Sequence, residues 1–297
     1  MTAFLPAIAP VALIILIGFI ASRFLSLETQ SLSEITVYIL APALVAHSLY
    51  RTTVSLESAT GLILGFLLVS LVIYVIVQIV ARMLRLPQSL RTSLLASTLF
   101  PNNGNLGLPL ISLAFGSVGL ERAIIYMIAS SVLTFGLGPP LLKGKGLKFG
   151  LNLTLKLPLF WAMVLGLTGR LFHVSLPLNL ADGVKLLGEG AIPLALVILG
   201  IQLAGTKFTI KVKELLGVAL RLLLAPLVAL IIGTLLQLDL IDLQVLVIQS
   251  AMPTAVNTVV LVTEFGGDID WATRAIVLST LISFITLPLW LWIVNLG

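Results

Sequence analysis

The chain has 297 residues, of which 59% are hydrophobic and 10% are charged, and its mean hydropathy is +1.18. A chain this apolar cannot bury its side chains in one aqueous core, which excludes a soluble globular protein and predicts an integral membrane protein. The formal charge of +5 comes from cations dispersed among the connections, which does not indicate nucleic-acid binding, and the sequence contains no cysteine for a disulfide or a thiolate metal site.

Ten apolar windows follow one another along the chain. Each is close to the length of roughly 20 residues that a helix needs to cross ~30 Å of hydrocarbon. We therefore predict an all-α membrane protein with ten transmembrane helices. The windows are 4–22, 35–50, 58–80, 92–117, 121–142, 157–174, 185–205, 214–236, 242–265 and 272–294.

The first window is predicted to be a retained span. It lacks the basic segment that precedes the apolar part of a cleavable signal peptide, since the first positive charge is Arg23. With an outer N-terminus, twelve Lys and Arg residues fall in inner connections and four in outer ones. Because positive charges favour the inner side, we expect a multi-pass protein of a bacterial-type inner or plasma membrane, with both termini outside.

The fourth window contains the stretch FPNNGNLGLPL, which is unusually hostile to a helix. Pro101 lacks a backbone N–H and its ring clashes with the preceding turn, while Gly104 and Gly107 lower the cost of leaving helical geometry. Pro101 lies nine residues into the window, or ~14 Å at ~1.5 Å per residue, so the break is expected near the middle of the membrane. Pro253 interrupts the ninth window at a similar depth.

The two interruptions also match when the chain is compared with itself. Matches in corresponding windows predict a duplicated unit of five helices. Since five is odd, the second copy enters the membrane from the opposite side, which is the inverted repeat of secondary transporters. The matched pairs are Pro101 with Pro253, Asn105 with Asn257 and Arg122 with Arg274 at an offset of 152, Pro42 with Pro193 at 151, and Gly116 with Gly266 at 150.

The border between the copies is predicted in the stretch KGKGLKFGLNLTLK, whose glycines and lysines are typical of a loop. We expect a first five-helix repeat over 1–142, a cytoplasmic linker over 143–156 and a second, inverted repeat over 157–297.

The broken fourth and ninth helices are expected to cross and form a binding site. Unpaired backbone groups in hydrocarbon cost several kcal/mol each, so nearby polar side chains must repair the breaks or face a cavity. The N-termini of the second half-helices would favour an anion, whereas unwound carbonyls would favour Na⁺. The asparagines could bind a ligand or only repair and cap the helices. The candidate contacts are Asn102, Asn103, Asn105, Thr254, Asn257 and Gln249.

Two side chains are candidates for ion coupling. Ser131 lies in the fifth window beside Ser130 and Thr134, although such hydroxyls usually bond a carbonyl one turn back. Glu189 could carry a coupling proton if it were buried, or lie at the outer interface. Arg221, inside the eighth window, is expected to extend toward lipid headgroups rather than to meet the substrate.

The remaining unusual residues have structural interpretations. His47 and His173 have no second ligand at metal spacing, so no metal site is expected. Pro42 and Pro193 are expected to kink their helices, and they could also line the substrate path.

The motifs PNNGNLGLPL and AMPTAVNTVVLVTEFGGD resemble those of the auxin efflux carrier family, which includes the plant PIN exporters and many bacterial carriers within the bile acid/sodium symporter-like superfamily. The resemblance implies a scaffold from helices 1, 2, 6 and 7 and a transport domain from helices 3–5 and 8–10 with crossing helices. It also implies elevator-type movement, a homodimer, and small organic anions such as auxin-like carboxylates as substrates, with Pro101 and Pro253 at the crossing.

The predicted function is therefore a secondary active transporter, acting by efflux or exchange on a small organic anion, without a cofactor and with coupling to H⁺ or Na⁺ left open. The alternatives are a sodium-coupled organic anion symporter and a membrane channel or sensor on the same fold. The resemblance implies that sodium-coupled members of the superfamily carry acidic and polar side chains beside the crossing, whereas the ninth window here has no carboxylate at its break and none nearer than Glu264. An enzyme is not expected, because the windows contain no nucleophile with a base and no acidic pair.

Overall fold

The computed structural model describes residues 5–138, 142, 147–174, 176–205 and 212–295, and the elements assigned in these ranges are helices apart from one isolated β-bridge. The first half contains α1 (Leu5–Phe24), α2 (Thr29–Ile35), η2 (Thr36–Leu40), α3 (Ala41–Arg51), α4 (Leu56–Met83), α5 (Gln88–Leu99), η3 (Asn103–Gly107), α6 (Leu108–Val132) and η4 (Leu133–Leu137). The second half contains α8 (Leu147–Leu155), α9 (Pro158–Leu171), η5 (Pro177–Asn179), α10 (Leu180–Ala204), α11 (Val212–Ala219), η6 (Leu220–Leu224), α12 (Ala225–Leu235), α13 (Leu240–Ser250), α14 (Thr258–Glu264) and α15 (Ile269–Val294).

Within the described ranges, six helical runs are long and apolar enough to cross a membrane, or seven if α8 and α9, which meet at 67°, form one bent span. The protein is therefore an integral, multi-pass membrane protein. The helices α1 and α13 are apolar but shorter, and α5 is short because the chain leaves helical geometry after Leu99. The number of ten spans stays a prediction. The six runs are Thr29–Arg51, Leu56–Met83, Asn103–Leu137, Pro177–Ala204, Glu214–Leu235 and Ile269–Val294.

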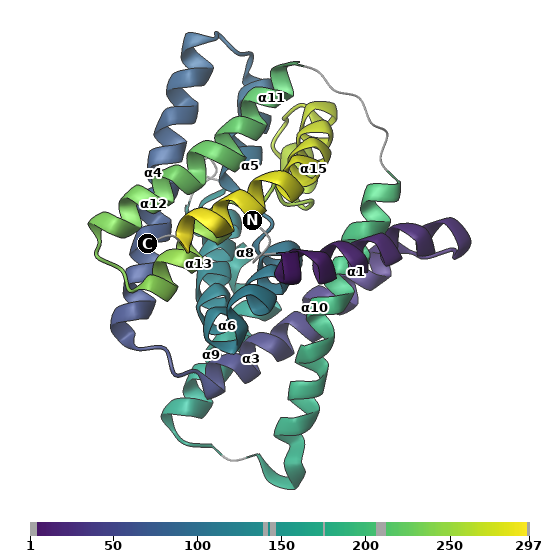
Figure 1. The fold of residues 1–297 in the computed structure, drawn as a ribbon, viewed down its shortest axis with the longest axis vertical. Coiled ribbons are helices and arrows are strands. Elements are labelled where there is room, and N and C mark those ends of the chain that lie inside the picture. The colour runs from purple at the N-terminus through teal and green to yellow at the C-terminus, as the bar shows by residue number, and fades with distance from the viewer. Residues whose placement is uncertain (1–4, 139–141, 143–146, 175, 206–211, 296–297) are drawn as a thin grey trace.

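Four helices, α1, α3, α9 and α10, pack closely on one another. The helices α1 and α10 lie side by side at one edge of the molecule (Figure 1), and α3 packs against both α9 and α10. Small residues allow these approaches, since a Cβ on Gly18 or on Gly200 would collide with the backbone of the facing helix. These four helices are called the small-residue group below.

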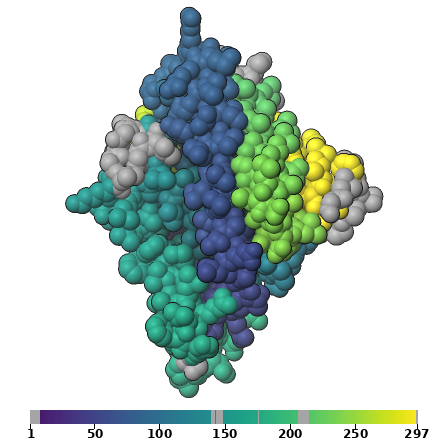
Figure 2. Space-filling view, turned by 90° about the vertical axis from the view of Figure 1, so that its left-hand side faces the viewer, coloured from purple at the N-terminus to yellow at the C-terminus, as the bar shows by residue number. Residues whose placement is uncertain are grey.

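The remaining long helices pack around α4, α6 and α13. The helix α4 contacts α5, α6, α12 and α13, and Figure 2 shows α4 and α12 side by side on one face. Capping side chains define two of the helix starts: Ser55 accepts from the backbone N–H of Ser58 at the start of α4, and Asp268 accepts from Trp271 at the start of α15. These helices, α4 to α6 and α11 to α15, are called the broken-helix group.

The two glycines that match at an offset of 150 share an unusual backbone conformation. Gly116 has φ +64° and Gly266 has φ +72°, which side-chain-bearing residues rarely adopt. Gly116 interrupts α6, and Gly266 follows the end of α14. Each therefore turns the chain at the far end of the segment that follows a break.

The predicted linker 143–156 is only partly a loop. Residues 143–146 lie outside the described part of the chain, but Leu147–Leu155 form the helix α8, so the prediction of a loop is wrong there. In the sequence, Gly150 is a turn signal. In the structure a Cβ on Gly150 would collide with the backbone of Gly136, so this glycine allows α8 to pack against η4.

Candidate functional site

The two interrupted segments contact each other through their main chains. The backbone N–H of Asn102 donates to the carbonyl of Pro253 over 2.8 Å, and the N–H of Ala255 donates to the carbonyl of Phe100 over 2.9 Å. These bonds surround an isolated antiparallel bridge between Pro101 and Thr254. Backbone groups that leave the helical ladder at one proline are thus satisfied by the segment at the other.

Thr254 completes this repair rather than lining a cavity. Its hydroxyl donates to the carbonyl of Ser97 over 2.8 Å, and its N–H donates to the hydroxyl of Ser279 over 3.2 Å. The side chain is buried and is absent from the cavity wall described below. The expectation that Thr254 contacts substrate is therefore not supported by its position, because both of its polar groups are used within the protein.

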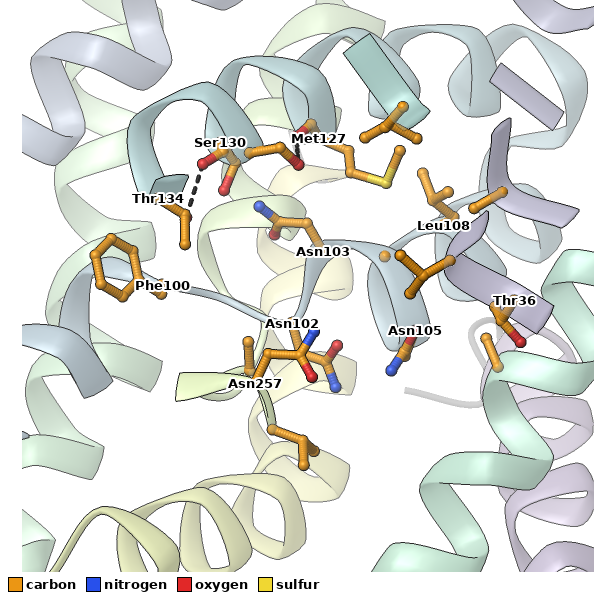
Figure 3. A pocket seen from close by; sticks show the side chains of 18 of the residues that line it. Thr36, Phe100, Asn102, Asn103, Asn105, Leu108, Met127, Ser130, Thr134 and Asn257 are labelled. Carbon is orange, nitrogen blue, oxygen red and sulfur yellow. Dashed lines mark hydrogen bonds between the residues drawn. The ribbon is translucent and has the colours of Figure 1, made fainter. Parts of the chain in front are cut away.

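A cavity of about 200 Å³ opens beside the paired breaks. Its wall combines η3, α6 and the 255–258 stretch of the broken-helix group with α3, α10 and the η2 segment. Figure 3 shows four asparagine side chains gathered around it. The polar residues of the wall are Thr36, Asn102, Asn103, Asn105, Ser130, Ser131, Thr134, Asn257 and Thr258.

Several of these polar atoms have no hydrogen-bond partner among the described residues. The buried atoms without a partner include Nδ2 of Asn102, both polar side-chain atoms of Asn103 and the hydroxyl of Thr258. Asn257 stands at the N-cap of α14, yet its side chain makes no capping bond. Buried polar groups are nearly always bonded, so this cluster is where a polar ligand or water would be held.

The cavity carries no charged side chain among the described residues of its wall. The helix that starts at Asn103 and continues through η3 into α6 begins at this wall, and the N-terminus of a helix carries a partial positive charge. The second expected N-terminus is weaker, since α14 has seven residues and starts at Thr258.

Gly104 and Gly107 differ from their predicted role. The non-helical stretch ends at Asn102, so both glycines lie in the first turn after the break. Gly104 lines the cavity, whereas Gly107 packs against Gln249, whose Oε1 would collide with an added Cβ.

Gln249 also differs from its predicted role. The residue is 0% exposed, and its Nε2 lies 3.4 Å from the carbonyl of Ala123. It is not part of the cavity wall. Gln249 comes just before Pro253 in the sequence, but the sequence does not show how α13 is rotated. In the structure, the side of α13 that carries Gln249 faces α6 and η3.

The coupling candidates lie in different surroundings. Ser131 lines the cavity and donates to the carbonyl of Met127 over 2.9 Å, as hydroxyls in membrane helices commonly do. The side chain of Glu189 is 59% exposed and lies 3.7 Å from Lys185, so it is a surface ion pair rather than a buried carboxylate.

Two arginines that match in the repeat each pair with a buried carboxylate. Arg122 donates to Asp242 over 2.5 Å, and Arg274 donates to Glu214 over 2.7 Å. Asp242 and Glu214 are nearly inaccessible. These pairs join α6 to α13 and α15 to α11. Because the partners lie far apart in the sequence, a local sequence pattern does not reveal the pairs.

Arg221 is buried behind the breaks, so the prediction that it extends toward lipid headgroups is wrong. It is 4% exposed and donates to the carbonyls of Thr98, Ser250 and Met252. The reason lies in the two breaks: these carbonyls are left without helical partners, and a guanidinium has five donors to offer.

Some lining residues were missed from the sequence. Thr36 begins the π-helical turn η2, and Thr258 follows Asn257 directly, so adjacency to a candidate was the available signal for the latter. Pro42 and Pro193 are not in the wall themselves, although Ala41 and Ile192 beside them are. Among the described residues, no group of three or more His, Asp or Glu side chains could hold a metal ion.

The chain is similar to known membrane transport proteins. A family model described as "Membrane transport protein" matches residues 3–150 and 147–291. An uncharacterized transporter of Methanothermobacter thermautotrophicus is 29% identical over 94% of this chain and 95% of its own length. The uncharacterized transporter MJ1031 of Methanocaldococcus jannaschii is 26% identical over 95% and 96%. The uncharacterized transporter YfdV of Escherichia coli is 28% identical over 66% of each chain.

Proposed function

This chain belongs to the membrane transport protein family, the family of the auxin efflux carriers, and from that premise we propose that it is a secondary transporter of small organic anions. The observation that carries the proposal is the cavity of about 200 Å³ beside the paired breaks, with its unpartnered asparagine atoms. The substrate would bind there and leave by efflux or exchange.

The chemistry of the wall favours an anion with an apolar body. The amide nitrogens of Asn102 and Asn103 can donate to a carboxylate, and the helix that starts at Asn103 adds a partial positive charge. The rest of the wall is largely apolar, including Leu44, Leu108 and Ile192. A cavity of ~150 Å³ holds benzene, so a volume of about 200 Å³ suits an acid with one ring or a short chain.

We propose further that the ten predicted spans form two inverted repeats whose fourth and ninth helices cross at the breaks. Three matched features support this arrangement. The prolines of both breaks lie in the bridged segments, the glycines at the offset of 150 share a positive φ, and the two matched arginines each bind a buried carboxylate.

We propose that transport moves one of the two groups of helices relative to the other. The small-residue group, which corresponds to predicted helices 1, 2, 6 and 7, would be the scaffold. The broken-helix group, which corresponds to 3–5 and 8–10, would carry the substrate past it in an elevator-type step. The position of the cavity supports this, because its wall takes residues from both groups, such as Asn103 and Ala195, so that relative sliding would expose it to one side and then the other.

The orientation in the membrane, the oligomeric state and the coupling ion are also proposals. The distribution of Lys and Arg supports outward termini. A homodimer in the bilayer is proposed to form on the small-residue group, whose helices α1 and α9 carry exposed apolar side chains such as Leu16 and Leu165. Coupling to H⁺ or Na⁺ is open, and Ser131 is the coupling candidate that lies at the cavity. A sodium-coupled symporter is the less favoured alternative, because no carboxylate occurs among the described residues of the wall.

A thermal-shift screen of the purified protein tests the substrate class. Organic acids would be compared with their neutral amides, at two pH values and with Na⁺ or choline as the cation. A bound ligand raises Tm by mass action, so at least one acid should raise Tm while its amide does not. If amides stabilise the protein as well as acids do, or if no acid in a broad panel acts, the organic-anion proposal is wrong.

A further inference from the structure

Arg221 occupies an unusual place for a membrane-embedded cation. It lies in the π-helical turn η6 between α11 and α12, is 4% exposed, and has no carboxylate paired with it among the described residues. Its Nε donates to the carbonyl of Met252 over 2.9 Å and its Nη1 to that of Thr98 over 2.7 Å, while Nη2 donates to the carbonyl of Ser250. All three acceptors are backbone carbonyls.

These carbonyls belong to the ends of the two first half-helices. Thr98 lies in the last turn of α5, Ser250 ends α13, and Met252 follows within the second break. The N–H that would normally bond the Thr98 carbonyl is that of Asn102, which donates to Pro253 instead. The corresponding partner of Ser250 is the N–H of Thr254, which donates to Ser279. Both carbonyls are therefore orphaned by the breaks, and Arg221 binds them.

The guanidinium also balances charge. The C-terminus of a helix carries a partial negative charge, and α5 and α13 end within reach of the same side chain. In transporters with broken helices, converging carbonyls of this kind can instead coordinate a coupling Na⁺. The gap beside Arg221 measures about 10 Å³, which leaves room for no more than about one water molecule.

We propose that Arg221 is a positioning residue that takes the place of a coupling metal cation. Its guanidinium permanently ties the end of α5 to the end of α13, keeps the two breaks in register, and makes Na⁺ unnecessary at this point. This inference goes beyond the proposed function, because it concerns how the breaks are held and does not depend on which substrate is carried.

The test is the thermal stability of the purified full-length protein in detergent, with choline, Na⁺ or guanidinium chloride at equal millimolar concentrations. The change in the wild-type Tm between choline and Na⁺ is the reference, because Na⁺ coupling at the cavity is open. R221A removes the cation and leaves its space, so Tm should fall by several degrees in choline and recover by a few degrees with guanidinium or Na⁺. R221K, which restores a charge but not the three hydrogen bonds of the guanidinium, should have an intermediate Tm and should respond to Na⁺ no more than the wild type does. R82Q, at an exposed arginine in the last turn of α4, is the matched control and should behave as the wild type.

Each other outcome overturns the proposal. A rise of Tm with Na⁺ that is no larger in R221A than in the wild type would show that Arg221 does not take a cation's place, because Na⁺ bound at the cavity would act equally on both proteins. An R221A protein as stable as the wild type would show that Arg221 holds nothing, and a loss that neither cation recovers would show that it acts by packing alone. If R221A does not fold, R221K decides: a folded protein that Na⁺ stabilises no more than the wild type supports the proposal, and one that Na⁺ stabilises more contradicts it. None of these readouts involves transport, so their failure is distinct from failure of the proposed function.

Discussion

The backbone N–H of Asn102 donates to the carbonyl of Pro253 over 2.8 Å, which joins two segments separated by about half the chain. Each segment is the point where a membrane helix stops and restarts. Because the bond uses groups that a continuous helix would have consumed, the two breaks stabilise each other. The same pairing places Asn102 and Asn103 at a cavity with their side-chain amide nitrogens unpaired within the described structure.

Asn103→Ala should separate ligand binding from folding. Both polar atoms of this side chain are buried without a partner among the described residues, so their removal should leave Tm unchanged or slightly raised in the absence of ligand. The rise in Tm caused by an organic acid that stabilises the wild type should be lost. Asn152→Ala, at an exposed position of α8, is the control and should retain the full rise. Retention of the rise in Asn103→Ala would place the ligand elsewhere.

Gly107→Ala should destabilise the protein through a steric collision. The added Cβ would overlap Oε1 of the buried Gln249, and overpacking of this kind costs roughly 1–3 kcal/mol. The loss can be measured as a decrease in the free energy of unfolding in mixed SDS micelles. Combining it with Gln249→Ala should cost less than the sum of the two single variants, because one removes the cause of the other's strain. Strict additivity would argue against this contact.

Gly116→Ala should destabilise the protein through backbone strain alone. No atom lies within 4 Å of the position that an added Cβ would take, but φ +64° with ψ −157° is a conformation essentially restricted to glycine. The expected loss is about 1–3 kcal/mol. Gly183→Ala is the matched control, since this glycine is helical and also has no neighbour within 4 Å. It should leave stability unchanged or raise it by roughly 0.4–1 kcal/mol.

Arg122→Gln should be strongly destabilising because it leaves a buried carboxylate without its paired cation. Asp242 is 2% exposed, and removing one partner of a buried pair costs roughly 3–5 kcal/mol. Lys185→Gln breaks the exposed pair with Glu189 and should cost less than about 1 kcal/mol. Restoration of stability in the double variant Arg122→Gln with Asp242→Asn would identify the stranded charge as the cause. Equal effects at the two sites would contradict the difference in burial.

Much of the fold could be predicted because the hydrocarbon core of a bilayer restricts this chain to long apolar helices. Window lengths and composition indicate a helical, multi-pass membrane protein, and Pro101 and Pro253 mark where helices stop. The loop predicted over 147–155 was wrong because glycine serves both turns and close helix packing, and a sequence does not distinguish them.

The candidate site was harder to predict, because side-chain direction depends on how each helix is rotated. Asn103 and Gln249 look equivalent in sequence, yet the first faces the cavity and the second faces Gly107. Arg221 was misjudged for a related reason. Its partners are carbonyls orphaned by breaks in two other helices, and these become visible only when the helices are brought together.

Exchange of a labelled organic acid across proteoliposome membranes tests the central claim most directly. The acid would be one that raises the Tm of the wild type, and wild type, Asn103→Ala and Asn152→Ala would be reconstituted at equal density. We expect exchange by wild type and Asn152→Ala, saturable and blocked by excess unlabelled acid, and none above background by Asn103→Ala. Exchange by Asn103→Ala at the wild-type rate, or a wild-type protein that binds the acid but never moves it, would contradict a transport site at the paired breaks.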